Sequence, residues 1–314
     1  MTAGTFPRHA STSSLPRWIV FAITFACAPP ALAQEIEPRA YSNVPVDMNF
    51  AVVAYAHATG SFAADPSLPL EDADLRTDAI LLGYARSIEV CGQSGKVDVV
   101  LPYVWLEGTA DVAGIPQQRR VAGFGDPRVR LSWNLIGAPA LTLKEFASYR
   151  QQTIVGVSFQ ASLPLGQYDD TRFVNLGTNR WWLKPELGVS HASGPWTFEA
   201  AVAATHFTEN DEYSGGRSRK QDPIYSLQGG AIYGFGRGKW IALHGNYYTG
   251  GRTTVDGIEG DDLQQNSLLR VTAAWPLNAR DSLKFFAGTG VSTRTGADFD
   301  TVSVAWQRRW GGGL

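Results

Sequence analysis

The amino-acid sequence predicts an all-β protein, a 12-stranded antiparallel up-and-down transmembrane β-barrel. Twelve stretches alternate apolar and polar residues, which is the period of half-apolar strands. The links between them alternate between tight turns and long polar loops, as in barrels whose loops gather at one end. Beyond the N-terminus, no stretch approaches ~18 uninterrupted apolar residues. Without helical spans, a chain that crosses a bilayer must be a closed barrel, because lipid cannot satisfy an open backbone edge.

The first 33 residues have the pattern of a cleaved signal peptide. Arg8 and Arg17 precede or open a short apolar run over 18–28, and Ala31-Leu32-Ala33 gives an A-x-A cleavage site. Cys27 raises the alternative of a lipoprotein, but Phe25-Ala26 before it fits a lipidation site poorly. We therefore expect cleavage after Ala33, a periplasmic lead-in over 34–47 and a barrel over 48–314.

The alternation places the strands in chain order. They are expected at 48–59, 76–90, 96–108, 121–136, 151–164, 178–192, 195–208, 223–235, 239–250, 264–277, 281–292 and 300–310. The long loops follow at 60–75, 109–120, 165–177, 209–222 and 251–263, with a short sixth loop at 293–299. An even strand number puts both termini on one side, which we expect to be the periplasm. The connection 137–150 is too long for a turn and predicts a small helix or hairpin there.

The main structural alternative is a soluble β-sandwich or lipocalin-like barrel, whose strands also alternate. Its outward face would be polar. Here one face of the last strands is apolar, while the opposite face carries Arg270, Lys284 and Arg294. A narrow interior filled with Arg and Lys makes no soluble core, but it makes a wet lumen. The pattern therefore favours a membrane barrel in the outer membrane of a Gram-negative bacterium.

Charge and cysteine content exclude several classes. Removal of residues 1–33 takes away two cations and no carboxylate, so the net charge moves from −2 to −4, and no basic surface for nucleic acid is expected. Cys91 is the one cysteine of the mature chain, which excludes an internal disulfide. No cofactor or metal site is predicted, since the acidic loop segments at 169–172 and 256–262 lack calcium-loop spacing.

Two sets of side chains are candidates for function. Most tryptophans fall near strand ends and are expected in interfacial girdles, whereas Trp182 shares a face with Arg180 and Lys184 and is the candidate for stacking on a ligand. The lumen is expected to hold either a structural ladder of paired charges or a constriction that orders solutes. Its candidate residues are Arg128, Arg130, Lys184, Glu186, Glu199, His244, Asn246, Arg270, Lys284 and Arg294. Cations outnumber carboxylates in this set, which suggests a mild anion preference.

An enzyme is the rival class, because an outer-membrane phospholipase is also a 12-stranded barrel. The mature chain has His57, His191, His206 and His244. None lies in a His-x-Ser-Asn-Gly type motif, and Gly-x-Ser-x-Gly is absent. No catalytic residue is therefore assigned. A structural or adhesive barrel, whose outer loops contact partners, stays open as a further alternative.

From Gly123 onward, a series of short motifs resembles one family. They include Gly123-Phe124-Gly125-Asp126-Pro127, Pro164-Leu165-Gly166-Gln167-Tyr168-Asp169, Asn175-Leu176-Gly177-Thr178-Asn179-Arg180-Trp181 and Tyr248-Thr249-Gly250-Gly251-Arg252-Thr253. This combination resembles the family named for the MetA pathway of phenol degradation, a set of outer-membrane transporter-like barrels. The residues that match are Gly125, Asp126, Pro127, Asn175, Gly177, Asn179, Arg180, Gly250, Gly251 and Arg252.

The resemblance implies a channel or transporter loosely associated with aromatic compounds. Its expected partners are small-molecule solutes, outer-membrane lipid and lipopolysaccharide, and the barrel-assembly machinery. That machinery reads an aromatic residue at the C-terminus, a role we expect for Trp310 despite the tail Gly311-Gly312-Gly313-Leu314. Arg308, on the apolar side of the same strand, is expected near an interface.

Overall fold

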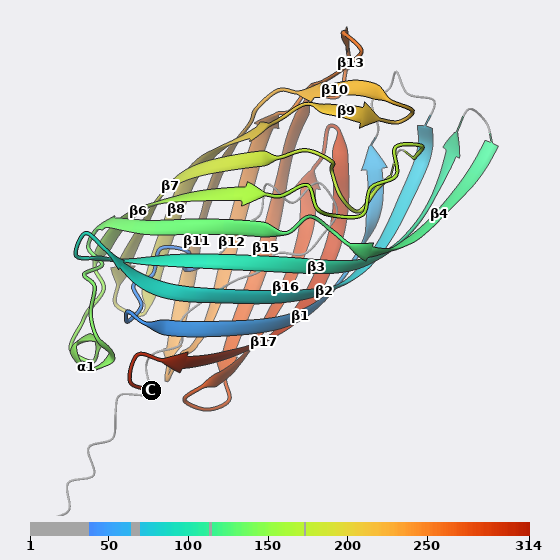
Figure 1. Cartoon of the computed structure of the whole chain (residues 1–314). Helices are drawn as coiled ribbons and strands as arrows, with labels where there is room; N and C mark the ends of the chain where they lie inside the picture. Colours follow the sequence, from blue (N-terminus) through green and yellow to red (C-terminus); the bar gives the residue numbers. More distant parts are fainter. Residues whose placement is uncertain (1–37, 64–69, 113–114, 173) are drawn as a thin grey trace, which may run out of the picture.

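The computed structural model describes residues 38–63, 70–112, 115–172 and 174–314. The expected signal peptide and the first four residues of the expected lead-in lie outside the described residues. The chain forms one closed antiparallel barrel (Figure 1). Its first strand, β1 (Met48–Ala63), pairs with its last, β17 (Gly296–Gly311), from Met48 opposite Gly311 to Ala63 opposite Gly296. This pairing closes the wall and confirms the predicted fold class.

The wall has twelve positions. The strands are β1, β2 (Leu70–Val90), β3 (Gln93–Val112), β4 (Ile115–Phe124), β5 (Arg128–Ile136), β6 (Thr153–Ser162), β7 (Trp182–Ser193), β8 (Trp196–Phe207), β11 (Ile224–Gly236), β12 (Lys239–Gly250), β15 (Gln264–Pro276), β16 (Asp281–Ser292) and β17. Both β4 and β5 pair with β3, the first near the loops and the second near the turns, so the two share one position.

The break between β4 and β5 corrects the prediction of one unbroken strand over 121–136. It falls at Gly125-Asp126-Pro127. Pro127 has no N–H to donate to a ladder, and the Asp126 side chain binds backbone outside the wall. The next strand, β6, pairs with β5 on this side and with β7 on the other. The residues that follow β6, 163–172 and 174–181 of the described chain, are here called the mouth loop.

Three expected loops contain strands that extend past the membrane-crossing length or pair in a separate sheet. The hairpin of β3 and β4 pairs up to Val112 opposite Ile115, within the expected loop 109–120. The expected loops 209–222 and 251–263 contain a second, four-stranded sheet of β9 (Asn210–Tyr213), β10 (Arg217–Gln221), β13 (Thr253–Val255) and β14 (Ile258–Glu259). Polar sequence does not prevent pairing in an antiparallel hairpin, since the ladder uses backbone groups.

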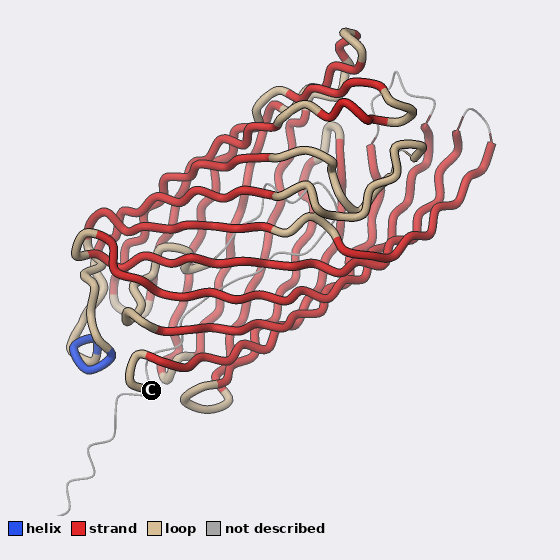
Figure 2. The backbone as a smooth tube through the Cα atoms, viewed as in Figure 1, coloured by secondary structure: helices blue, strands red, loops and turns tan. Residues whose placement is uncertain are grey.

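The two ends of the barrel differ. One end, the terminal end, holds the start of β1, the end of β17 and the tight turns, while the small sheet lies at the other, the loop end (Figure 1). The predicted element in the connection 137–150 is the helix α1 (Leu143–Phe146), drawn blue in Figure 2. It starts with a capping box, in which Thr142 and Glu145 each bind the other's backbone N–H. Both termini of the barrel therefore lie at one end, as predicted.

The outer face of the barrel is apolar. Large side chains such as Val53, Leu82, Leu131, Val202 and Leu243 point outward and are 43–50% exposed. Such a continuous apolar exterior is what a lipid-facing band requires. None of the described helices is long and apolar enough to cross a membrane.

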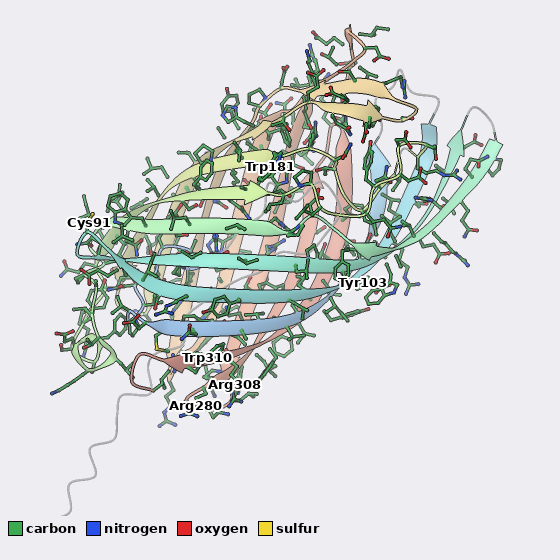
Figure 3. The ribbon with its side chains drawn as sticks, in the orientation of Figure 1. Cys91, Tyr103, Trp181, Arg280, Arg308 and Trp310 are labelled. Atoms are coloured by element: carbon green, nitrogen blue, oxygen red, sulfur yellow. The ribbon has the colours of Figure 1, made fainter. Side chains whose placement is uncertain are left out.

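Aromatic residues lie toward both edges of this exterior. Trp105, Trp181, Trp196, Trp275, Trp306 and Trp310 are exposed. Figure 3 places Trp310 and Arg308 at the terminal end, with Trp181 and Tyr103 farther toward the loop end. Arg308 reaches Asp281 at 3.5 Å, consistent with a place at the interface. Trp240 differs from the predicted girdle because it is inward and only 2% exposed.

Candidate functional site

The inward face divides into two sectors. Strands β1 to β3 are apolar on the inside as well as the outside. Their inward residues form one packed cluster of Met48, Phe50, Val52, Ala54, Ala56, Ala79, Leu81, Ala85, Val100, Val104 and Leu106, with Phe286 and Ala305 beside them. We call this the apolar sector. The sequence pattern did not predict it, because strand 96–108 was interpreted as apolar on one face only.

The charged sector covers the remaining wall, from Lys96 and Asp98 near the start of β3, through β5, round to β16. The predicted lumen residues Arg128, Lys184, His244, Asn246 and Lys284 are buried inside the barrel, and Arg130, Glu186, Glu199 and Arg270 are partly buried on the same face. The structure therefore brings together all but one of the predicted set. Arg294 is the correction: it lies in the turn after β16, with its side chain 42% exposed and 3.1 Å from Asp261. Strand β16 ends at Ser292, two residues before it.

Charge pairs line this sector. Arg130 Nε lies 3.1 Å from Asp98 Oδ2, and Lys184 Nζ lies 3.4 Å from Glu186 Oε2. His244 Nε2 lies 3.3 Å from Glu199 Oε2.

Sequence reasoning missed Asp98, which lies on β3 between the outward Val97 and Val99. Lys96 and Asp98 alternate with Val97 and Val99, and this alternation could have identified Asp98 as an inward residue. The paired arrangement fits the predicted ladder, and it stabilises the lumen only when each pair stays intact.

Residues 38–47 enter the barrel at the terminal end, and we call them the lumen segment. Tyr41 is 5% exposed, and its hydroxyl donates to Glu186 Oε1 at 2.8 Å. Its ring occupies the space left by two glycines of the wall, since a Cβ on Gly156 or Gly188 would come within 2.3 or 2.1 Å of it. The segment was expected to be a simple periplasmic lead-in, but it fills part of the lumen.

Further contacts fix the lumen segment. The backbone N–H of Arg39 donates to Glu199 Oε2 at 2.9 Å, and its guanidinium lies 5.1 Å from the ring centre of Trp240. Lys96 Nζ donates to the Ala40 carbonyl at 2.6 Å. Residues of the charged sector thus bind the lumen segment in addition to pairing with one another.

The connection 137–150 holds the other side of this segment. Asn43 Nδ2 donates to the Pro139 carbonyl at 3.1 Å, and Val46 N donates to the Leu141 carbonyl at 2.9 Å. A meander needs only a tight turn between β5 and β6. The additional residues of this connection therefore contact and support the lumen segment at the terminal end.

The motif residues of the resemblance meet at the loop end. Asp126 is their centre: one carboxylate oxygen accepts from Gly166 N at 2.9 Å, and the other accepts from Thr178 N and Oγ1 at 2.8 and 2.7 Å. Gly177 packs on Gly166, where a Cβ would come within 2.8 Å of the backbone. Asn175 ties the loop internally through the backbone of Asp169. These residues thus fold the mouth loop over the end of the barrel.

A second part of the motif set joins the mouth loop to the small sheet. The Arg180 guanidinium donates to the Gln221 side chain of β10, and Gln221 Nε2 donates to the Gly251 carbonyl at 2.8 Å. Gly250 has φ of 118°, and a Cβ there would meet the Pro223 carbonyl at 2.2 Å. Asn179, with φ of 52°, donates to Asn210 and Glu212. Arg252, just before β13, pairs with Glu259 of β14.

Solved structures of outer-membrane barrels resemble this fold. The COG4313 outer membrane channel from Pseudomonas putida F1 is 22% identical with a TM-score of 0.75, and the match covers 88% of this chain and 100% of that one. The transport unit of the autotransporter AIDA-I from Escherichia coli is 7% identical with a TM-score of 0.48, over 83% and 90% of the two chains. The CymD monoaromatic hydrocarbon channel is 10% identical with a TM-score of 0.45, over 85% and 89%.

No curated protein matches the sequence significantly. A family model does match, over residues 58–306. This span contains every motif residue that meets at the loop end, and it confirms the resemblance drawn from those motifs. The chain belongs to the family described as "Putative MetA-pathway of phenol degradation".

Proposed function

We propose that the protein is an outer-membrane channel for passive diffusion of small molecules with apolar or aromatic bodies. The observation that carries this proposal is the division of the lumen. A purely polar lumen suits sugars and ions, whereas the apolar sector of β1 to β3, packed and buried here, supplies apolar side chains that would line the path of a solute once the lumen segment is displaced. The charged sector opposite it keeps the path wetted. Such a lumen passes solutes without chemistry, so no catalytic group is required.

The lumen segment is the gate in this proposal. It occupies the terminal end between the charged sector and the connection 137–150. A barrel of this strand number has a narrower lumen than the open 16–18-stranded porins. Small conductance, rising when the segment is displaced, is the expected behaviour. The terminal end faces the periplasm in this arrangement, with Trp310 presented to the assembly machinery and the loop end among lipopolysaccharide.

Liposome swelling tests the proposal. Proteoliposomes are challenged with phenol, with a phenolic alcohol and with a sugar of similar mass, and empty liposomes set the background leak. Protein-dependent entry of the phenolic solutes ahead of the sugar is the expected result. If none of these solutes enters, the channel hypothesis is rejected and the adhesive barrel is favoured. Hydrolysis of labelled phospholipid by the protein would instead support the enzyme hypothesis.

Ion selectivity gives a separate readout of the charged sector. Its cations Lys96, Arg128, Arg130, Lys184 and Lys284 outnumber the carboxylates Asp98, Glu186 and Glu199 on the inward face. A mild anion preference follows if the pore is wet along these strands. Reversal potentials measured in a salt gradient check this, and cation selectivity would contradict it.

A further inference from the structure

Arg180 at the loop end is a buried cation with an unused donor. It lies at the end of the mouth loop, just before β7, and is 7% exposed. Its Nη2 binds Gln221, and its guanidinium lies 4.5 Å from the ring centre of Phe207. Nη1 is buried and has no hydrogen-bond partner among the described residues. A buried donor on a charged group is costly to leave unpaired, so this N–H points to an acceptor that binds there.

A second guanidinium adds to the positive charge. Burial, together with the neighbouring charge of Arg219, lowers the pKa of Arg180 to about 9. Arg219, on β10, has its guanidinium 5.0 Å from the ring centre of Tyr213. Within the described chain neither arginine has a carboxylate within ion-pair distance, and both oxygens of the nearby Asp126 are used by the mouth loop. Two adjacent cations without a paired carboxylate attract an anion.

Aromatic side chains adjoin these cations on the lumen side. Trp182 of β7 and Phe207 of β8 are direct neighbours across the two strands, and Trp182 is 7% exposed. The alternation of β7 puts Trp181 outside, where it is 44% exposed, and Trp182 inside. An anion held by Arg180 therefore has its remaining body next to rings. Trp182 therefore stays the candidate for stacking on a ligand.

We propose that Arg180, Arg219, Trp182 and Phe207 form a binding site for an aromatic carboxylate of benzoate size. The guanidinium fork of Arg180 matches a carboxylate, and the rings contact the aromatic body of the solute. The site lies at the loop end, where an external solute meets the protein first. The inference rests on the proposed channel function, for which this site loads the solute into the lumen.

Calorimetric titration of the purified full-length protein in detergent micelles tests the site. Sodium benzoate is the ligand, and acetate, benzyl alcohol and inorganic phosphate are the comparison probes. We expect benzoate to bind at least about tenfold more tightly than each of them, since each lacks either the ring or the carboxylate. Phosphate or acetate binding as tightly as benzoate would overturn the aromatic carboxylate as the ligand.

Two variants locate the binding. Arg180→Gln removes the buried fork and is expected to weaken benzoate binding by about tenfold or more. Arg219→Gln leaves the Arg180–Gln221 contact in place and is also expected to weaken benzoate binding. This second variant keeps the site testable if Arg180→Gln misfolds. Arg280→Gln, in a turn at the terminal end (Figure 3), is the matched control. Benzoate affinity unchanged in both loop-end variants would refute the site.

The two proposals fail separately. If neutral phenol enters liposomes through wild-type protein and benzoate does not bind, the channel function is supported and the benzoate site is refuted. If benzoate binds with the expected variant pattern and no solute permeates, the site stands and the channel falls.

Discussion

Replacing Tyr41 by Phe tests whether the lumen segment is a gate. The substitution keeps the ring between Gly156 and Gly188 and removes the hydroxyl that donates to Glu186 at 2.8 Å. Glu186 is a carboxylate whose side chain is 8% exposed. A hydrogen bond to a charged group contributes about 1.5–3 kcal/mol, and about 1.4 kcal/mol changes a population tenfold. The displaced state should therefore rise roughly ten- to hundredfold.

Gly188→Ala perturbs the same contact from the wall. The new Cβ would lie 2.1 Å from Cε2 of Tyr41, far inside van der Waals contact. Strand β7 is paired on both sides, to β6 and to β8, so the ring moves more easily than the wall. We expect the segment to be displaced in a larger share of molecules than in Tyr41→Phe.

Single-channel recording in planar bilayers measures both effects. The fraction of time in the larger conductance should increase from wild type to Tyr41→Phe to Gly188→Ala. Tyr248→Phe is the control, because its hydroxyl also lies in the lumen, bound by Asn266 at 3.1 Å, but toward the loop end. Identical open fractions in all four folded proteins would refute the gate.

Three further tests address the wall, the exterior and the mouth loop. Arg130→Leu should lower the free energy of unfolding in urea by about 3–5 kcal/mol, and adding Asp98→Asn should restore part of it; a double variant no more stable than the single would contradict the pairing. Leu243→Arg, in the apolar exterior, should cost about 2–4 kcal/mol, whereas Gln265→Arg near the loop end should cost about 0–1 kcal/mol; equal costs would contradict the lipid-facing band. Asp126→Asn should speed proteolysis of residues 163–181 roughly tenfold or more, and unchanged cleavage would show that this carboxylate does not anchor the loop.

Strand positions followed from sequence because burial on one face imposes period two. The strands 239–250 and 281–292 match the predicted bounds. The strands extend further than predicted at the loop end. Neither face of a strand contacts lipid there, so apolar and polar residues no longer alternate clearly. The break at Asp126 was not predicted, because the alternation was extended through Pro127 and the hydrogen bonds of Asp126 reach residues 40 and 52 positions away.

The candidate site was predictable where side chains belong to the wall. Alternation alone placed Lys184, Glu186 and Glu199 inside. It could not place Tyr41, because the lumen segment has no periodic pattern and its position depends on two glycines far along the chain. Arg294 was misplaced since alternation was extended beyond the end of β16. Arg180 was identified as a motif residue and as a neighbour of Trp182 on one face, but its burial and its unpaired Nη1 depend on tertiary contacts that the sequence does not give.

The long connection 137–150 shows how a departure from the turn pattern carries information. Lengthening a turn of a few residues to fourteen takes about two doublings, which cost roughly 1 kcal/mol in closure entropy. The connection contributes no strand to the wall, so no strand pairing offsets this entropy cost and other contacts must do so. Its carbonyls at Pro139 and Leu141 accept two hydrogen bonds from the lumen segment, each contributing about 1 kcal/mol. In a barrel of this kind, one overlong turn at the terminal end is therefore a signal that another segment of the chain enters the lumen beside it.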